Sequence, residues 1–231
     1  MRALYDAMRA LAYIESLTMD LSHGAPVYER GQWKSRLDLM IPVIKGWMTE
    51  VGQEVTSLGV QIHGGMGFIE ETGAAQFSRD VRVTAIYEGT NGIQAMDLVG
   101  RKMMDNGETA YAIINEVKEY IDNLSIVKKD LAELVAIATE TLRETVDYFI
   151  SRKDVSDRFG GAMPFLMGYA RVLGGFYHLK AAVAEGGTGS RTKLAEFYIR
   201  RILPEAMSFL AAARSNSEEI YNLSIDELVG S

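Results

Sequence analysis

Apolar residues recur every three or four positions over most of the chain, which is the spacing of one face of an α-helix. In the first stretch these positions are Leu4, Met8, Leu11, Ile14, Leu17 and Leu21. We therefore expect an amphipathic helix there, with this face buried. The proline and glycines of residues 22–32 (SHGAPVYERGQ) predict a loop after it.

A longer repeat of the same spacing predicts a long central helix. Its apolar positions are Trp33, Leu37, Ile41, Ile44, Met48, Val51, Val55, Leu58 and Ile62. Pro42 lies inside this segment and lacks a backbone N–H, so we expect either a kink or a helix that begins near that residue. The glycines of residues 63–68 (HGGMGF) predict the end of the helix, because glycine readily adopts left-handed caps.

Shorter helical patterns come next. Residues 74–83 predict a short helix, and another helix is expected to begin near residues 88–92. The positions that this second helix should turn inward are Ile93, Met96, Val99 and Met103. Turn-forming residues at 103–108 (MMDNGE) mark the predicted boundary between two domains.

The rest of the chain keeps the helical pattern. Two helices are expected from the apolar positions Tyr111, Ile114, Val117, Ile121 and then Val127, Leu131, Leu134, Ala138, Leu142 and Phe149. Two more are expected over residues 163–183 and 194–210. Period-two alternation is absent, and long helices with short connections pack as antiparallel bundles. We predict an all-α protein with an antiparallel helical bundle at 1–104 and a second helical bundle at 105–231.

The composition excludes several classes of function. A chain of 231 residues with 48% hydrophobic content can form a core, and its net charge of −7, with both signs mixed, offers no basic stripe for nucleic acid. There is no cysteine and the three histidines are dispersed, so we expect no metal site. No apolar run is long enough for a membrane span and no signal-peptide core is present, so a cytoplasmic location is expected.

Three clusters carry candidate chemistry: residues 61–68 (QIHGGMGF), 78–82 (SRDVR) and 86–94 (IYEGTNGIQ). Each has an ordinary explanation when taken alone. The glycines cap a helix, and Arg79 and Asp80 form a local ion pair. A glutamate such as Glu88 in the first turn of a helix compensates the helix dipole, which contributes ~0.3 to 1 kcal/mol.

Together, in this order and spacing, the clusters resemble the C-terminal helical domain of the acyl-CoA dehydrogenases. The matching residues are Gln61, Gly64, Gly65, Gly67, Phe68, Arg79, Asp80, Arg82, Ile86, Tyr87, Glu88, Gly89, Thr90, Ile93 and Gln94. The resemblance covers roughly residues 1–104. Residues 105–231 resemble the extra helical domain of longer bacterial members, among them the 3-methylmercaptopropionyl-CoA dehydrogenases.

This resemblance implies FAD-dependent α,β-desaturation of an acyl-CoA thioester, with Glu88 as the base that removes the α-proton. Such a base must be partly desolvated, and the developing enolate needs hydrogen-bond donors. In the family these donors are the backbone N–H of the base and a flavin ribityl hydroxyl. Gly89 lets the backbone approach the substrate without a side chain in the way. Tyr87 either lines the acyl pocket or is a core aromatic residue.

The resemblance also implies FAD contacts. Gln61, Gly64 and Gly65 match positions that contact the FAD of a neighbouring subunit, and Thr90 and Asn91 match positions beside the flavin of the same subunit. Small residues allow a phosphate to reach backbone amides.

Two positions depart from the family pattern. Many relatives carry glutamine where this chain has Gly92, so one cofactor contact is missing. His63 stands where the family often has an aliphatic residue, and we interpret it as a structural or cofactor-adjacent histidine.

Complete family members also contain an N-terminal helical domain and a middle β-domain, so the resemblance implies a fragment that is inactive alone and does not retain FAD. The implied partners are an acyl-CoA substrate, electron-transfer flavoprotein as electron acceptor, and further copies in a dimer or tetramer. Two alternatives stay open: a non-catalytic helical module for assembly, and an acyl-CoA oxidase that passes electrons to oxygen.

Overall fold

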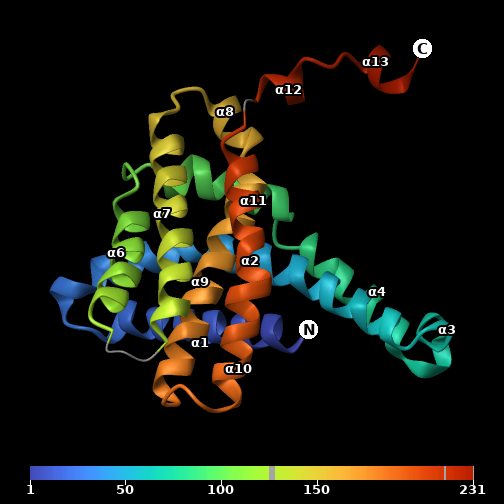
Figure 1. Ribbon diagram of the computed structural model, residues 1–231. Coiled ribbons are helices and arrows are strands. Elements are labelled where there is room, and N and C mark those ends of the chain that lie inside the picture. Colours follow the sequence, from blue (N-terminus) through green and yellow to red (C-terminus); the bar gives the residue numbers. More distant parts are fainter. Residues whose placement is uncertain (125–127, 216, 231) are drawn as a thin grey trace.

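The computed structural model describes residues 1–124, 128–215 and 217–230, and within these residues it contains helices and turns but no strand (Figure 1). The all-α prediction is confirmed. The main helices are α1 (Arg2–Gly24), α2 (Val27–Ile62), α4 (Ala74–Arg82), α5 (Asn91–Asp97), α6 (Glu108–Asp122), α7 (Lys129–Ser151), α9 (Ala162–Ala184), α10 (Ser190–Phe197) and α11 (Leu203–Ala213).

Shorter elements lie between the main helices or, for the last two short helices, after α11, and the sequence pattern did not predict most of them. They are α3 (Gly65–Phe68), α8 (Val155–Gly160), α12 (Glu218–Tyr221) and α13 (Ile225–Val229), the 3-10 turns η1 (Glu70–Thr72) and η2 (Val83–Ala85), and the π-helical turns η3 (Leu98–Lys102) and η4 (Tyr198–Ile202). Val127, expected as the first apolar position of α7, lies outside the described residues.

The predicted loop at residues 22–32 is mostly wrong. Only Ala25 and Pro26 separate α1 from α2, and Gly31 lies inside α2. Pro26 is the N-cap of α2, a place where its missing N–H leaves no hydrogen bond unmade. The helix continues through Pro42, so the alternative in which a helix begins there is also wrong. The predicted end of the helix is confirmed, because Gly64 follows it with φ of +59°.

The buried face of α1 differs from the predicted one in its second half. Leu4 and Leu11 are buried, but Leu17 is 52% exposed. The stripe that begins at Leu4 and Leu11 continues at three- and four-residue steps through polar positions. These buried polar residues are Glu15, Thr18 and Ser22. Leu17 therefore lies outside the buried stripe, and the apolar pattern predicted the wrong face for this half of the helix.

Helix α9 forms the centre of the molecule. Its residues are buried around nearly the whole circumference, which is typical of a core helix. It packs against α1, α2 and α5 from the first predicted domain and against α7, α10 and α11 from the second (Figure 1). The buried side chains of both predicted domains thus form one continuous core. The domain boundary at residues 104 and 105 stays a prediction.

An ionic cluster lies at the edge of this core, where α1, α2, α6 and α9 meet. Arg36 of α2 donates to Glu116 of α6 at 2.5 Å and to the Tyr177 hydroxyl of α9 at 3.3 Å. Glu15 of α1 is buried beside Arg36 without a hydrogen bond to its Oε2 atom. Burial raises the pKa of Glu15 to about 7, and Arg36 only partly opposes this.

The end of α2 leaves the body of the molecule together with α3 and α4, forming an arm (Figure 1). Ile62 and Phe68 at its tip are 72% and 82% exposed. Ile62 was expected to be buried, and it is exposed because this part of α2 extends beyond the bundle.

None of the helices in the described part of the chain combines the length and the apolar character that a membrane span needs.

Close packing of α2 on α9 predicts opposite effects for two glycines of the same helix. A Cβ on Gly46 would lie 2.8 Å from the Leu166 side chain of α9, whereas a Cβ on Gly31 would meet nothing within 4 Å. Alanine improves helix propensity at both positions by up to ~1 kcal/mol. We expect Gly31→Ala to stabilise the protein and Gly46→Ala to destabilise it by about 1 to 3 kcal/mol. Urea unfolding measures both, and equal shifts of the same sign would contradict the packing.

The buried Glu15 predicts a stability that depends on pH. Its pKa is about 7 in the folded protein and 4.5 in the unfolded reference, so the folded state holds the proton more tightly. The contribution is fully present below pH 4.5 and is lost as the pH rises through about 7. We expect Glu15→Gln to gain up to about 3 kcal/mol over the wild type between acid pH and about pH 8.

Urea unfolding at the two pH values gives this difference. Glu133→Gln on the exposed face of α7 is the control, for which no such gain is expected. A gap between wild type and Glu15→Gln that stays constant with pH would show that folding does not raise the pKa of Glu15.

Candidate functional site

Glu88 lies in a left-handed turn that precedes α5. Its φ is +56° and that of Gly89 is +87°. Thr90 is the N-cap of the helix, which begins at Asn91. The ordinary explanation of Glu88 as part of a helical first turn is therefore wrong. Left-handed φ is uncommon for a residue with a side chain, and such outliers often occur at functional sites.

Two side chains hold this turn through its carbonyl groups. Gln94 Nε2 donates to the Glu88 carbonyl at 3.1 Å, and Lys45 Nζ donates to the Gly89 carbonyl at 2.7 Å. Within the described part of the chain, the backbone N–H groups of Glu88 and Gly89 make no hydrogen bond. The Glu88 side chain is exposed. The turn thus presents a carboxylate and free N–H donors on its open side.

Gly89 is required in this turn for two reasons. Its φ lies in the region that L side chains rarely adopt, and a Cβ would lie 3.1 Å from Gln94 Nε2. The sequence predicted a glycine here because it gives a ligand access to the backbone. The structure adds a second reason, which is the space and backbone conformation that the turn itself requires.

Asn91 is buried, and its amide is used inside the protein. Its Oδ1 accepts from Lys45 Nζ at 2.9 Å, and its Nδ2 donates to Thr49 Oγ1 at 2.9 Å and to Glu50 Oε1 at 2.7 Å. The predicted cofactor contact therefore cannot use the Asn91 side chain, because its hydrogen bonds are already made. Thr90 Oγ1 accepts from the Ile93 N–H at 3.4 Å, and a cofactor contact of Thr90 stays a prediction.

Lys45 is a site residue that the sequence pattern did not single out. Burial lowers the pKa of Lys45, while the carboxylates of Glu88 and Glu50 oppose this shift. The sequence does contain a sign of this role, because Lys45 is the single charged residue in the apolar segment PVIKGWM. The helical spacing of that segment predicts only which apolar residues are buried.

Tyr87 is 51% exposed, so its interpretation as a core aromatic residue is wrong. Ile93 and Met96 are exposed as well, although the pattern directed them inward, whereas Val99 and Met103 are buried as expected. The open side of the turn therefore has an apolar border. A role of Tyr87 in an acyl pocket stays a prediction.

The second group of predicted site residues lies at the start of the arm. Gln61, Gly64 and Gly65 are exposed, and added Cβ atoms on either glycine would meet nothing within 4 Å. The backbone is thus open to an approaching phosphate, and the residues present fit the dinucleotide part of FAD. His63 Nδ1 lies 2.8 Å from the Gly59 carbonyl, which supports its structural interpretation.

The ordinary explanation of Arg79 is confirmed in part. Its guanidinium forms an ion pair at 2.6 Å, but the partner is Glu70 rather than Asp80.

The two groups lie at different places in the molecule. Lys45, which holds the turn, and Gln61 at the arm are sixteen positions apart on the same helix, which corresponds to ~24 Å at 1.5 Å per residue. The expectation that the groups serve flavins of different subunits stays a prediction.

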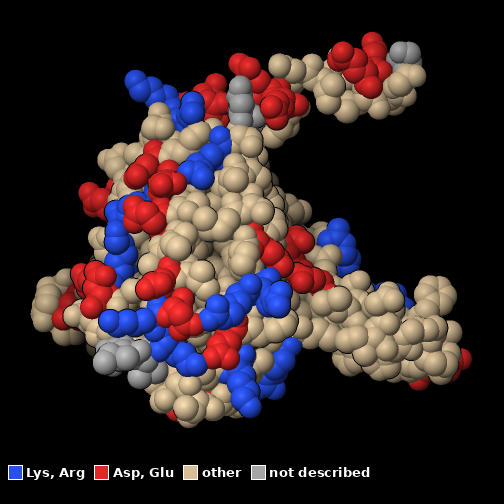
Figure 2. Space-filling model, viewed as in Figure 1, with Lys and Arg blue, Asp and Glu red and all other residues tan. Residues whose placement is uncertain are grey.

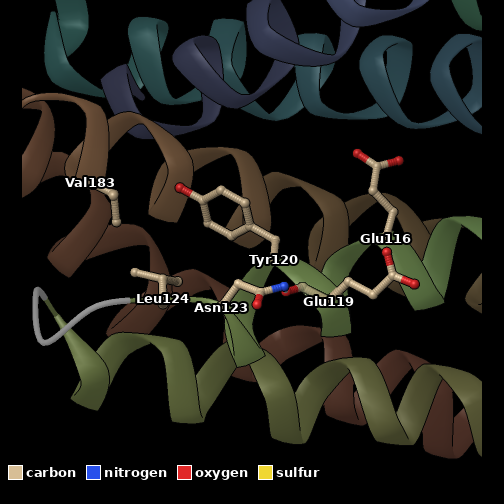
Figure 3. Close-up of a pocket in the computed structure, with 6 residues that line it drawn as sticks. All are labelled: Glu116, Glu119, Tyr120, Asn123, Leu124 and Val183. Carbon is tan, nitrogen blue, oxygen red and sulfur yellow. The ribbon is translucent and has the colours of Figure 1, made fainter.

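A separate pocket of about 430 Å³ lies between the end of α6 and α9. Figure 3 shows its lining side chains, which are Glu116, Glu119, Tyr120, Asn123, Leu124 and Val183. None of the predicted site residues is among them. The pocket therefore adds nothing to the chemistry of the Glu88 turn.

Comparison with known proteins identifies the class to which this fold and turn belong. Residues 1–104 match the family model of the acyl-CoA dehydrogenase C-terminal domain, and residues 113–224 match that of the acetyl-CoA dehydrogenase C-terminal-like domain. The chain belongs to the acyl-CoA dehydrogenase family.

Among individual relatives, 3-methylmercaptopropionyl-CoA dehydrogenase of Ruegeria pomeroyi is 36% identical over 221 residues, which cover 89% of this chain and 38% of the relative. Broad-specificity linear acyl-CoA dehydrogenase FadE5 of Mycobacterium tuberculosis is 28% identical over 206 residues, covering 82% of this chain and 34% of the relative. The chain thus spans little more than a third of the length of these relatives.

A solved structure shows the same fold. Caenorhabditis elegans ACDH-11, crystallised in complex with C11-CoA, matches 96% of this chain and 37% of its own chain with a TM-score of 0.70 and 19% identity.

Proposed function

We propose that this chain is the C-terminal part of a flavin-dependent acyl-CoA dehydrogenase and that Glu88 is its α-proton-abstracting base. The observation that carries the proposal is the turn at Glu88 and Gly89. Both carbonyls are held by side chains of the protein, while the carboxylate and the N–H groups remain open to a ligand. Family membership supplies the reaction class.

The residues of the turn have complementary roles. The Glu88 carboxylate takes the α-proton of the thioester, and the electron pair of the broken C–H bond forms the new α,β double bond. The N–H of Glu88 donates to the thioester oxygen and stabilises the negative charge that develops there. Bound FAD supplies the hydride acceptor for the β-hydrogen. Tyr87 lies beside the carboxylate on the exposed side, where it would border the acyl chain.

Water must be excluded for this reaction, since a solvated carboxylate is too weak a base for a thioester α-proton. The exposure of Glu88 means that the helices of this chain do not exclude it. We infer that the acyl chain and the flavin do so when bound. Gln61, Gly64, Gly65 and the Thr90 backbone are the groups of this chain that would contact FAD.

The proposal includes electron-transfer flavoprotein as acceptor, a homo-oligomeric enzyme and a cytoplasmic location. The exposed apolar tip of the arm supports assembly, because apolar surface of this kind is typical of protein contacts. Assembly as the sole function of the chain is the second candidate function, and the same apolar tip favours it. A requirement for the Glu88 carboxylate in flavin reduction distinguishes the catalytic function from assembly alone.

Replacement of Glu88 by glutamine in the complete, flavin-loaded enzyme tests the catalytic role. The substitution keeps the shape of the side chain but removes its capacity to take a proton. We expect the rate of flavin reduction by acyl-CoA in a single turnover to fall at least ~100-fold. Glu133→Gln on the exposed face of α7 should retain the wild-type rate. A near wild-type rate for Glu88→Gln would exclude Glu88 as the base and leave the assembly function.

The 231 residues alone should not retain FAD. The candidate FAD contacts Gln61, Gly64, Gly65 and Thr90 are open to solvent, and Gln61 lies ~24 Å along α2 from Lys45, which holds the turn before Thr90. We expect the chain, purified without added cofactor, to show no visible flavin absorption and to bind added FAD weakly in an equilibrium titration. A stoichiometric yellow complex would contradict this expectation.

A further inference from the structure

The ammonium group of Lys45 joins α2 to the turn at Glu88. It donates to the Gly89 carbonyl at 2.7 Å and to Asn91 Oδ1 at 2.9 Å. One contact lies just before α5 and the other at its first residue. Lys45 therefore fixes both the direction of the Gly89 peptide and the place where the helix begins.

The surroundings of Lys45 hold this group in place. Thr49 Oγ1, one turn further along α2, donates to the Lys45 carbonyl at 2.8 Å and accepts from Asn91 Nδ2 at 2.9 Å. The amide of Asn91 is thus fixed on both sides, so its oxygen faces the ammonium group. Ordered partners of this kind are what keep a site's geometry within narrow limits.

The two carboxylates around Lys45 differ in their surroundings. They are Glu88 from the turn and Glu50 from α2, and both oppose the lowering of the Lys45 pKa by burial. Glu50 also accepts from Asn91 Nδ2 at 2.7 Å, so it belongs to the internal network. Glu88 has no such hydrogen bond within the described residues and is the carboxylate that faces outward.

We propose that Lys45 is a positioning residue for Glu88, which holds the Glu88–Gly89 turn through the Gly89 carbonyl and the start of α5 through Asn91. This inference rests on the proposed function, and it assigns to the base a partner on α2. Removing Lys45 should therefore displace the turn and, with it, the Glu88 carboxylate.

Three variants of the complete flavin-loaded enzyme test the side chains that hold the turn. Lys45→Met removes the hydrogen bonds of the ammonium group, Lys45→Arg keeps a donor at that place, and Gln94→Ala removes the hydrogen bond to the Glu88 carbonyl. The rate of flavin reduction by acyl-CoA is measured in single turnovers.

For Lys45→Met we expect the limiting rate to fall about tenfold or more, because the carboxylate loses its position. Gln94→Ala should lower the rate as well, because it releases the Glu88 carbonyl. Lys45→Arg should restore part of the rate, because arginine can still donate to the Gly89 carbonyl. A wild-type rate in Lys45→Met, or no recovery in Lys45→Arg, would overturn the proposal.

Failure of this inference can be told apart from failure of the proposed function. If Glu88→Gln reduces flavin at the wild-type rate, the base is wrong whatever Lys45 does. If Glu88→Gln is inactive while Lys45→Met keeps the wild-type rate, the base stands and the role of Lys45 is refuted.

Discussion

The placement of Glu88 depends on the packing of α2, α5 and α9 against one another. Helix α5 has seven residues and is too short to be stable alone, so its position must come from tertiary contacts. Trp47 of α2, Ala95 of α5 and Leu98 at the following π-turn are buried in the common core. This core fixes the distance between Lys45 and the Gly89 carbonyl. It also offsets the conformational cost of a left-handed glutamate, which is on the order of 1 kcal/mol.

Much of the helical architecture could be predicted, because periodic apolar residues specify helices wherever helix-ending residues lie at both ends. The wrong predictions concern burial, which depends on tertiary contacts that the apolar spacing does not show. The buried stripe of α1 continues through Glu15 and Thr18, because a carboxyl near Arg36 and a hydroxyl bonded to its own helix can replace apolar side chains. Ile62 was predicted to be buried, but it is exposed, because the apolar pattern does not show whether a helix extends beyond the bundle against which it packs.

The candidate site was predictable in its residues but not in its conformation. The family motif located Glu88 and Gly89, but not the turn that places them before α5 rather than inside its first helical turn. Asn91 could not be recognised as buried, since its partners Lys45, Thr49 and Glu50 lie more than forty positions away in the sequence. Long-range hydrogen bonds of this kind leave no periodic signal.

Helix α2 gives the site residues a fixed geometry. Its middle is buried against α9 and carries Lys45 on the side that meets the turn, while its last turns carry Gln61 out along the arm. Figure 2 shows that the surface of the arm, in this view, carries few charged side chains. The turn at Glu88 lies on the body of the molecule, whereas Gly64 and Gly65 lie open on the arm, whose tip exposes apolar side chains. Because apolar surface of this kind is typical of protein contacts, the arm suits the proposed assembly with further copies of the chain.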